Sequence, residues 1–351
     1  METYYEQLHA RYYKKLMCKP RDDFAVCDEY LQGLNKADFI NAYRKLHEIY
    51  ARFYSDMERN PETFGLPLVE IEKYPSNTPK ARQTKIYQIP AMLHCLTVSG
   101  RFGDGVFAVD ANKLLSQIKL HKIAKKELLL NRLSGYGFFI SDWDGKNFTS
   151  DTFTFEYPDN PNILFVLRAV ARKTLKLSNA FCHEEKIHLL YYKIFEDNSE
   201  NIGEIDIDDY HDVLGGQAVF IGEFTKFMQT KEFMAFYNGF YRISYRKKDK
   251  ENHQFYTFHY NKYNLDLEFR LRLANISKYL DYINDLPKDI KTVFENGVCH
   301  HCACDCKNIK YTLDDLDKEA CIWNSFVFRN PKIEDIEYYK TLFELEQQHI
   351  K

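Results

Sequence analysis

The chain has 351 residues, of which 45% are hydrophobic and 28% are charged, and its formal net charge is −3. This length exceeds what a single hydrophobic core usually serves, so we expect several domains. The composition is typical of a globular protein. The near-neutral charge excludes a whole-chain preference for nucleic acid or anionic membranes, so any such binding needs a local patch of charge.

Residues 1–80 are predicted to form a helical region that ends in a linker. Apolar and aromatic residues recur at helical spacing over 5–16 and again over 39–53. Asp38 stands directly before the second run, where a helix N-cap is expected. These aromatic stripes are typical of helix faces that pack into a core.

Residues 81–160 have the most informative order of predicted elements. The elements are a helix over 90–98, a strand over 105–109, helices over 110–118 and 122–134, and strands over 138–140 and 152–157. Asp110 is the expected N-cap of the second helix, and Gly135 is the expected C-cap of the third. A turn at 144–145 separates the last two strands. This order of helix, strand, helix, helix, strand, wing and strand resembles a winged helix.

The resemblance to winged helices implies that this segment could contact DNA, since many of them place the second helix of the turn in the major groove. Residues 113–132 contain six Lys or Arg residues and one acidic residue, Glu127. The candidate phosphate contacts are Lys119, Lys122, Lys125 and Lys126. The alternative is a packing or partner-binding module, because the predicted helix lacks the run of Arg, Asn and Gln that reads base edges.

Residues 161–235 are predicted to be mainly helical, with runs over 163–177 and 184–195. The acidic stretch 204–212 lacks the spacing of a calcium-binding loop, so we expect it to be a solvated loop. Residues 236–351 turn to strands over 236–245, 255–260 and 265–273, followed by a helix over 276–286. This pattern predicts a three-stranded antiparallel sheet backed by helices, and an α+β, multi-domain protein.

Five of the nine cysteines lie between residues 299 and 321. The first thirty residues contain no signal-peptide pattern, and no window is apolar enough for a membrane span. We therefore expect a cytoplasmic protein without membrane contact. In that reducing compartment, clustered cysteines favour metal binding over disulfides.

The cysteine cluster predicts one zinc ion. Cys299 and Cys302 have the C-x2-C spacing of a zinc knuckle, and we expect Cys306 and Cys321 to complete the site. Two short predicted strands lie between the last two ligands, so residues 296–330 resemble a zinc ribbon, although a second C-x2-C pair is missing. Alternative ligands are Cys304, His300 and His301.

A site of four thiolates leaves no open position for water, so this zinc would be structural. An iron–sulfur cluster also takes four cysteines, but its common spacings differ. The sequence contains no nucleotide-binding loop, zinc-protease motif or serine nucleophile elbow. We therefore expect a non-catalytic intracellular protein that binds a protein partner or DNA. The alternative is an enzyme with an active site assembled from scattered residues, which a deep pocket with perturbed titratable groups would favour.

Overall fold

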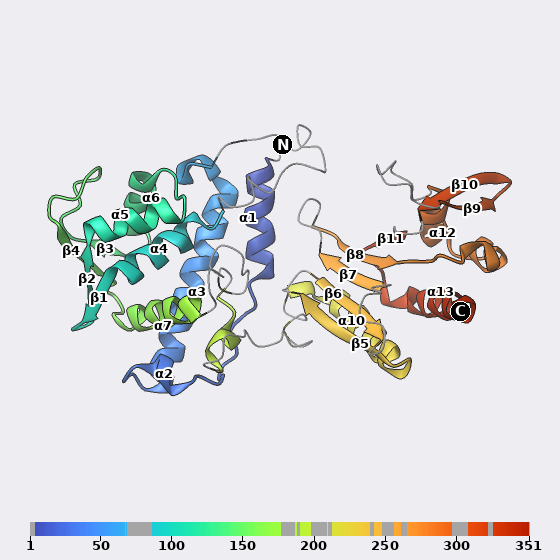
Figure 1. Cartoon of the computed structure of the whole chain (residues 1–351), viewed down its shortest axis with the longest axis horizontal. Coiled ribbons are helices and arrows are strands. Elements are labelled where there is room, and N and C mark those ends of the chain that lie inside the picture. The colour runs from blue at the N-terminus through green and yellow to red at the C-terminus, as the bar shows by residue number, and fades with distance from the viewer. Residues whose placement is uncertain are drawn as a thin grey trace. The chain divides into compact units, whose positions relative to one another are not determined.

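The chain divides into two compact units, Met1–Glu204 and Ile205–Lys351 (Figure 1). A computed structural model describes residues 4–66, 68, 86–176, 187, 190–197, 209, 213–238, 242–247, 256–260, 265–296, 308–321 and 326–350. Both units combine helices with antiparallel sheets, which confirms the predicted α+β class. The finer division into four segments stays a prediction.

The N-terminal part of the first unit is helical, as predicted. Its elements are α1 (Tyr5–Leu16), α2 (Asp28–Leu31), α3 (Lys36–Arg59) and a 3-10 turn, η1 (Pro61–Phe64). The predicted N-cap of the second helix was wrong. Helix α3 begins earlier and is capped by Asn35, whose side-chain oxygen accepts a hydrogen bond from the Asp38 amide at 2.9 Å.

Aromatic residues on these helices form the core of the first unit, as the helical spacing predicts. Tyr13 of α1 stacks on Tyr54 of α3 with ring centroids 5.7 Å apart. Phe53 meets Tyr136 edge-on at 4.4 Å. His47 is buried on the same helix, and desolvation lowers its pKa to about 4, so the ring stays neutral inside the core at neutral pH.

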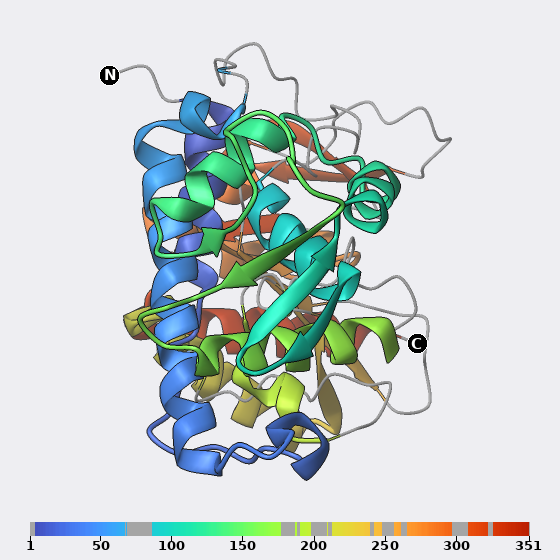
Figure 2. The ribbon, with the colours of Figure 1, turned by 90° about the vertical axis from the view of Figure 1, so that its left-hand side faces the viewer.

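A four-stranded sheet and four further helices complete the described part of this unit, with a 3-10 turn η5 (Tyr192–Phe195). The elements are α4 (Gln88–Ser99), β1 (Gly100–Gly103), β2 (Val106–Asp110), α5 (Ala111–Leu120), α6 (Lys126–Ser134), β3 (Phe139–Ile140), β4 (Thr152–Glu156) and α7 (Asn162–Lys176). The sheet is antiparallel, with strand order β1-β2-β4-β3. Figure 2 shows the hairpin of β1 and β2 reaching α7, where Phe102 contacts Phe165 at 4.7 Å.

Most of the elements predicted for residues 81–160 are confirmed. Asp110 caps α5 by accepting a hydrogen bond from the Lys113 amide at 2.8 Å. The sequence did not reveal β1, which lies between Gly100 and Gly103 and pairs with β2. A strand of this length bounded by glycines carries almost no alternation of polar and apolar residues, so only its pairing identifies it.

Helix α6 ends at Ser134 with Gly135 as its C-cap, as predicted, but it begins four residues later than predicted. It begins at Lys126 because Lys122 and Lys125 adopt left-handed backbone conformations, with φ of 52° and 55°. No glycine is available in this turn, and unbranched lysines tolerate the left-handed region better than β-branched residues do. The C-cap Gly135 is right-handed (φ −63°) rather than left-handed, and Gly137, two residues later, takes a positive φ of 94°.

The second unit contains a five-stranded antiparallel sheet with strand order β11-β8-β7-β6-β5 and a separate β9-β10 hairpin. The strands are β5 (Phe233–Asn238), β6 (Arg242–Lys247), β7 (Tyr256–Tyr260), β8 (Leu267–Leu271), β9 (Asn308–Leu313), β10 (Leu316–Cys321) and β11 (Phe326–Arg329). The helices are α10 (Gly216–Thr230), α11 (Leu280–Asn284), α12 (Lys288–Glu295) and α13 (Ile336–His349), with 3-10 turns η7 (Ile276–Lys278) and η8 (Ile333–Asp335).

The prediction of a three-stranded sheet was wrong. The predicted strand 236–245 is two antiparallel strands, β5 and β6, and β11 joins the sheet at its other edge by pairing with β8. Helix α10 was not predicted, and the acidic stretch 204–212 lies outside the described residues except for Asp209, which is 4% exposed rather than solvated. Of the predicted helix 184–195, residues 187 and 190–195 are described; Ile187 is helical and Tyr192–Phe195 form η5.

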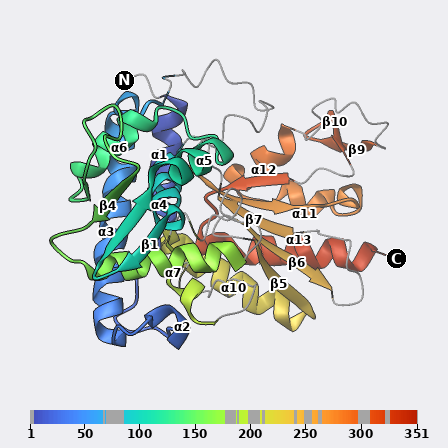
Figure 3. The same ribbon diagram turned by 60° about the vertical axis from the view of Figure 1, so that its left-hand side comes forward.

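Helices α10 and α13 pack on one face of the five-stranded sheet (Figure 3). Phe224 of α10 contacts Phe269 of β8 at 4.7 Å, and Phe343 of α13 contacts Tyr256 of β7 at the same distance. This aromatic layer is the core of the second unit. Within the described residues, no helix is both long enough and apolar enough to cross a bilayer.

Candidate functional site

Most of the predicted zinc ligands lie outside the described residues. Those residues are Cys299, Cys302, Cys306 and the alternatives Cys304, His300 and His301. Cys321 is the last residue of β10, where its backbone pairs with Asn308. Among the described residues, no group of three or more His, Cys, Asp or Glu side chains is placed to hold a metal ion. The zinc site therefore stays a prediction.

The four predicted phosphate contacts do not form one cluster. Lys119 is exposed near the end of α5, and Lys122 is exposed in the turn that follows. The aliphatic part of Lys125 packs beside Gly65, because a Cβ atom at that glycine would lie 2.8 Å from the lysine Cγ. Lys126 is half-buried at the start of α6 with its Nζ 3.7 Å from a Glu127 oxygen.

A groove of about 500 Å³ lies between α5, the first residue of α6 and the loop over residues 141–151, which we call the wing loop. Its lining residues are Ala111, Asn112, Leu115, Lys126, Trp143, Lys146, Asn147, Phe148, Thr149, Ser150 and Asp151. Asn112, Leu115 and Lys119 follow one another at helical spacing, so Lys119 lies on the face of α5 that borders the groove. The sequence missed Lys146, whose only signal was its position after the turn at 144–145.

The wing loop is fastened to α6 by one side chain. Asn131 accepts a hydrogen bond from the Trp143 indole N–H at 2.6 Å and donates one to the Gly145 carbonyl at 3.0 Å. Within the loop, Phe148 contacts Trp143 at 4.8 Å and stacks on Phe153 of β4 at 4.3 Å. Asn131 is therefore committed to the loop, and the loop holds the groove open on one side.

The charges of this groove favour an anion weakly. Two lysines, Lys126 and Lys146, and one carboxylate, Asp151, line the groove, and Lys126 is also 3.7 Å from Glu127. The remaining polar lining groups are amides, hydroxyls and an indole N–H, all of which can donate hydrogen bonds. Arg132, the remaining basic residue of α6, is used elsewhere. Its guanidinium lies 4.7 Å from the centre of the Phe64 ring and donates to the Thr63 hydroxyl.

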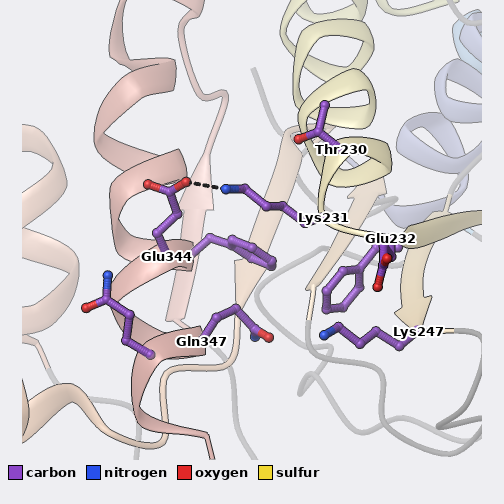
Figure 4. Close-up of a pocket in the computed structure, with 9 residues that line it drawn as sticks. Thr230, Lys231, Glu232, Lys247, Glu344 and Gln347 are labelled. Atoms are coloured by element: carbon purple, nitrogen blue, oxygen red, sulfur yellow. Dashed lines mark hydrogen bonds and ion pairs between the residues drawn. The ribbon is translucent and has the colours of Figure 1, made fainter.

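A second depression, of about 550 Å³, lies in the other unit among α10, β5, β6 and α13 (Figure 4). Lys231 and Glu344 point toward one another across it, with Nζ 2.6 Å from Oε1. Two lysines and two glutamates line it, the other pair being Lys247 and Glu232, so its charges balance. Neither depression is lined by histidine or cysteine within the described chain.

No protein-family model, curated protein or solved structure matches the chain. The candidate sites therefore rest on their own geometry. Of the two depressions, the groove beside the wing loop is the one with an excess of cationic and hydrogen-bond-donating groups.

Proposed function

We propose that the protein is a non-catalytic binding protein that contacts the phosphate backbone of duplex DNA through a winged-helix module over residues 88–156. The observation that carries the proposal is the groove that Lys126 of α6 and Lys146 of the wing loop both line. Lys119 lies on the adjoining face of α5. Many winged helices dock the second helix of the turn in the major groove. Here, that helix, α6, and the wing loop each contribute a lysine to the same groove.

The order of elements supports the module. Helix α4, the β1-β2 hairpin, helices α5 and α6, and strands β3 and β4 follow one another, and the wing loop connects the last two strands. Lysines and donor amides bind phosphates but carry no sequence information. We therefore expect binding that depends on salt and little on base sequence.

The proposal is tested by removing charge from the groove. In Lys126→Gln/Lys146→Gln, we expect affinity for a duplex of about 20 base pairs to fall about tenfold at ~50 mM salt, because two phosphate contacts are lost. Fluorescence anisotropy of a labelled duplex measures the change. The matched control is Lys36→Gln/Lys45→Gln, which removes the same charge from exposed positions on α3. Equal losses of affinity in the two double variants would show a general effect of charge and would refute DNA binding through this groove.

A protein partner is the second candidate, and one observation favours it. Leu115 lines the groove and is 38% exposed, and Leu120, at the end of the same helix, is 69% exposed. Exposed leucines that adjoin a groove are typical of protein contacts. Unlike the duplex, such a partner would bind with little dependence on salt.

The proposal retains a structural zinc ion and a cytoplasmic setting, where thiols stay reduced. One described feature supports the proposed pairing of Cys306 with Cys321. Asn308 pairs with Cys321 at the open end of the β9-β10 hairpin. Cys306 precedes Asn308 by two residues in the sequence and lies outside the described residues.

A further inference from the structure

The five-stranded sheet of the second unit has a second face that differs from its aromatic core. Alternation along the strands places Phe258 and Phe269 on the core face and their neighbours Thr257, Glu268 and Arg270 on the other. On β6, the same alternation puts Arg242, Ser244 and Arg246 on this second face, because Ile243 and Tyr245 between them are buried in the core. The second face is thus polar and rich in arginine.

The carboxylate on the second face is already engaged. Glu268, whose side chain is 4% exposed, accepts hydrogen bonds from Arg270 at 2.5 and 3.2 Å, and its Oε2 lies 3.5 Å from His259 Nδ1. Glu268 therefore neutralises Arg270 and not Arg246. On the described part of this face, no other acidic side chain stands beside β6.

Two buried polar atoms on β6 have no hydrogen-bond partner among the described residues. They are the Ser244 hydroxyl, on a residue that is 0% exposed, and the Arg246 Nε. Both residues point to the second face, two positions apart on one strand. A buried donor without an acceptor is costly, and a guanidinium donor is best satisfied by an anion.

The neighbours of these atoms are also suited to an anion. Strand register places Thr257, 8% exposed, directly opposite Ser244, so their side chains lie within ~5 Å. Phe236 lies opposite Ser244 on the other side, and the Arg246 guanidinium lies 5.0 Å from its ring centre. An arginine and two hydroxyls on adjoining strand positions of one face provide donors from three side chains, a set that suits the several oxygens of a phosphate group.

We propose that Arg246, Ser244 and Thr257 form a phosphate-binding site on the second face of this sheet. Arg246 supplies the charge, and the two hydroxyls donate to further phosphate oxygens. Phe236 and Met234, which are 38% and 41% exposed, adjoin Arg246 on the same face and provide an apolar surface for the organic part of a phosphate monoester. This site is separate from the proposed DNA-binding module and does not depend on it.

Isothermal titration of the full chain tests the site with two probes, inorganic phosphate and adenosine monophosphate. We expect a Kd below about 1 mM for at least one of them. Arg246→Gln should weaken binding at least about tenfold, and Ser244→Ala about three- to tenfold. Tighter binding of the nucleotide would identify the ligand as a phosphate monoester with an aromatic organic part. Equal affinities for the two probes would identify it as free phosphate.

The matched control is Arg329→Gln, which removes an exposed arginine from the same face on the far edge strand β11. The affinity of this variant for the two probes should stay within about twofold of that of the parent protein, since a solvent-exposed charge on the far edge strand is screened from the site. Circular dichroism confirms that each variant is folded. Absence of binding of both probes up to about 10 mM, or an equal loss in Arg329→Gln and Arg246→Gln, would overturn the proposal.

Discussion

Replacing Glu346 by alanine is expected to lower the free energy of unfolding of the second unit by about 3–5 kcal/mol. Glu346 lies on α13, is 1% exposed and accepts hydrogen bonds from the backbone amides of Ala274 and Asn275, the Asn275 side chain and the Tyr279 hydroxyl. Removing the carboxylate leaves these buried donors without an acceptor. It also releases α13 from the segment between β8 and α11.

The Tyr279 hydroxyl is one of the buried donors that depend on Glu346. Burial, together with the Glu346 carboxylate, raises the pKa of Tyr279, so its hydroxyl remains a donor at neutral pH. The hydrogen bond of 2.7 Å between the two side chains is then available throughout the ordinary pH range. Glu346→Gln should therefore be milder than Glu346→Ala, because the amide oxygen still accepts from some of the donors.

Urea denaturation followed by circular dichroism measures the effect, and hydrogen exchange locates it. The matched control is Glu344→Ala on the same helix, where a carboxylate that is 44% exposed pairs with Lys231. An exposed pair of this kind contributes no more than about 1 kcal/mol. A loss for Glu346→Ala as small as that of the control would contradict a structural role for the buried carboxylate.

The second large effect concerns zinc. In Cys299→Ser/Cys302→Ser, we expect the metal content to fall from one zinc per chain to none and residues 290–351 to lose stability, while the first unit stays folded. Zinc contributes on the order of 10–16 kcal/mol to the folding of small zinc peptides. A two-stranded hairpin such as β9-β10 is only marginally stable by itself. One described contact that stabilises it is the hydrogen bond that the Tyr311 hydroxyl donates to the Phe294 carbonyl at 2.6 Å.

Elemental mass spectrometry gives the metal content, and hydrogen exchange reports on β9 and β10. Cys27→Ser provides the control, since Cys27 is a free cysteine of the first unit at a half-buried position. Unchanged zinc in the double variant would refute the ligand assignment. If the parent protein contains iron and absorbs visible light, the cysteines hold an iron–sulfur cluster and not zinc.

The parts of the fold that were predictable from sequence are those with local signals. Helix α5 was placed correctly because Asp110 caps it, and β8 because its residues alternate strictly. The boundary between β5 and β6 was missed although the sequence carries Asn238 and Gly239, a dipeptide typical of two-residue hairpin turns. The aromatic residues on both sides of this dipeptide were interpreted as one continuous strand. Strand β11 was missed as a sheet member because its partner β8 is more than fifty residues away in the chain.

The candidate groove was only partly predictable for a similar reason. Lys119 and Lys126 were selected from the run of lysines, but Lys146 joins them only because Asn131 holds the wing loop against α6. The left-handed turn at Lys122 and Lys125 divided the rest of the predicted patch. Likewise, Ser244 and Arg246 gave no signal in sequence, since their lack of partners is visible only once the sheet is formed.

The measurement that tests the proposed function most directly is the affinity of the unmodified protein for duplex DNA as a function of salt. If Lys119, Lys126 and Lys146 each neutralise a phosphate, log K should fall with log salt concentration with a slope of about −3. A slope close to zero, or no binding even at ~50 mM salt, would contradict DNA binding through this groove.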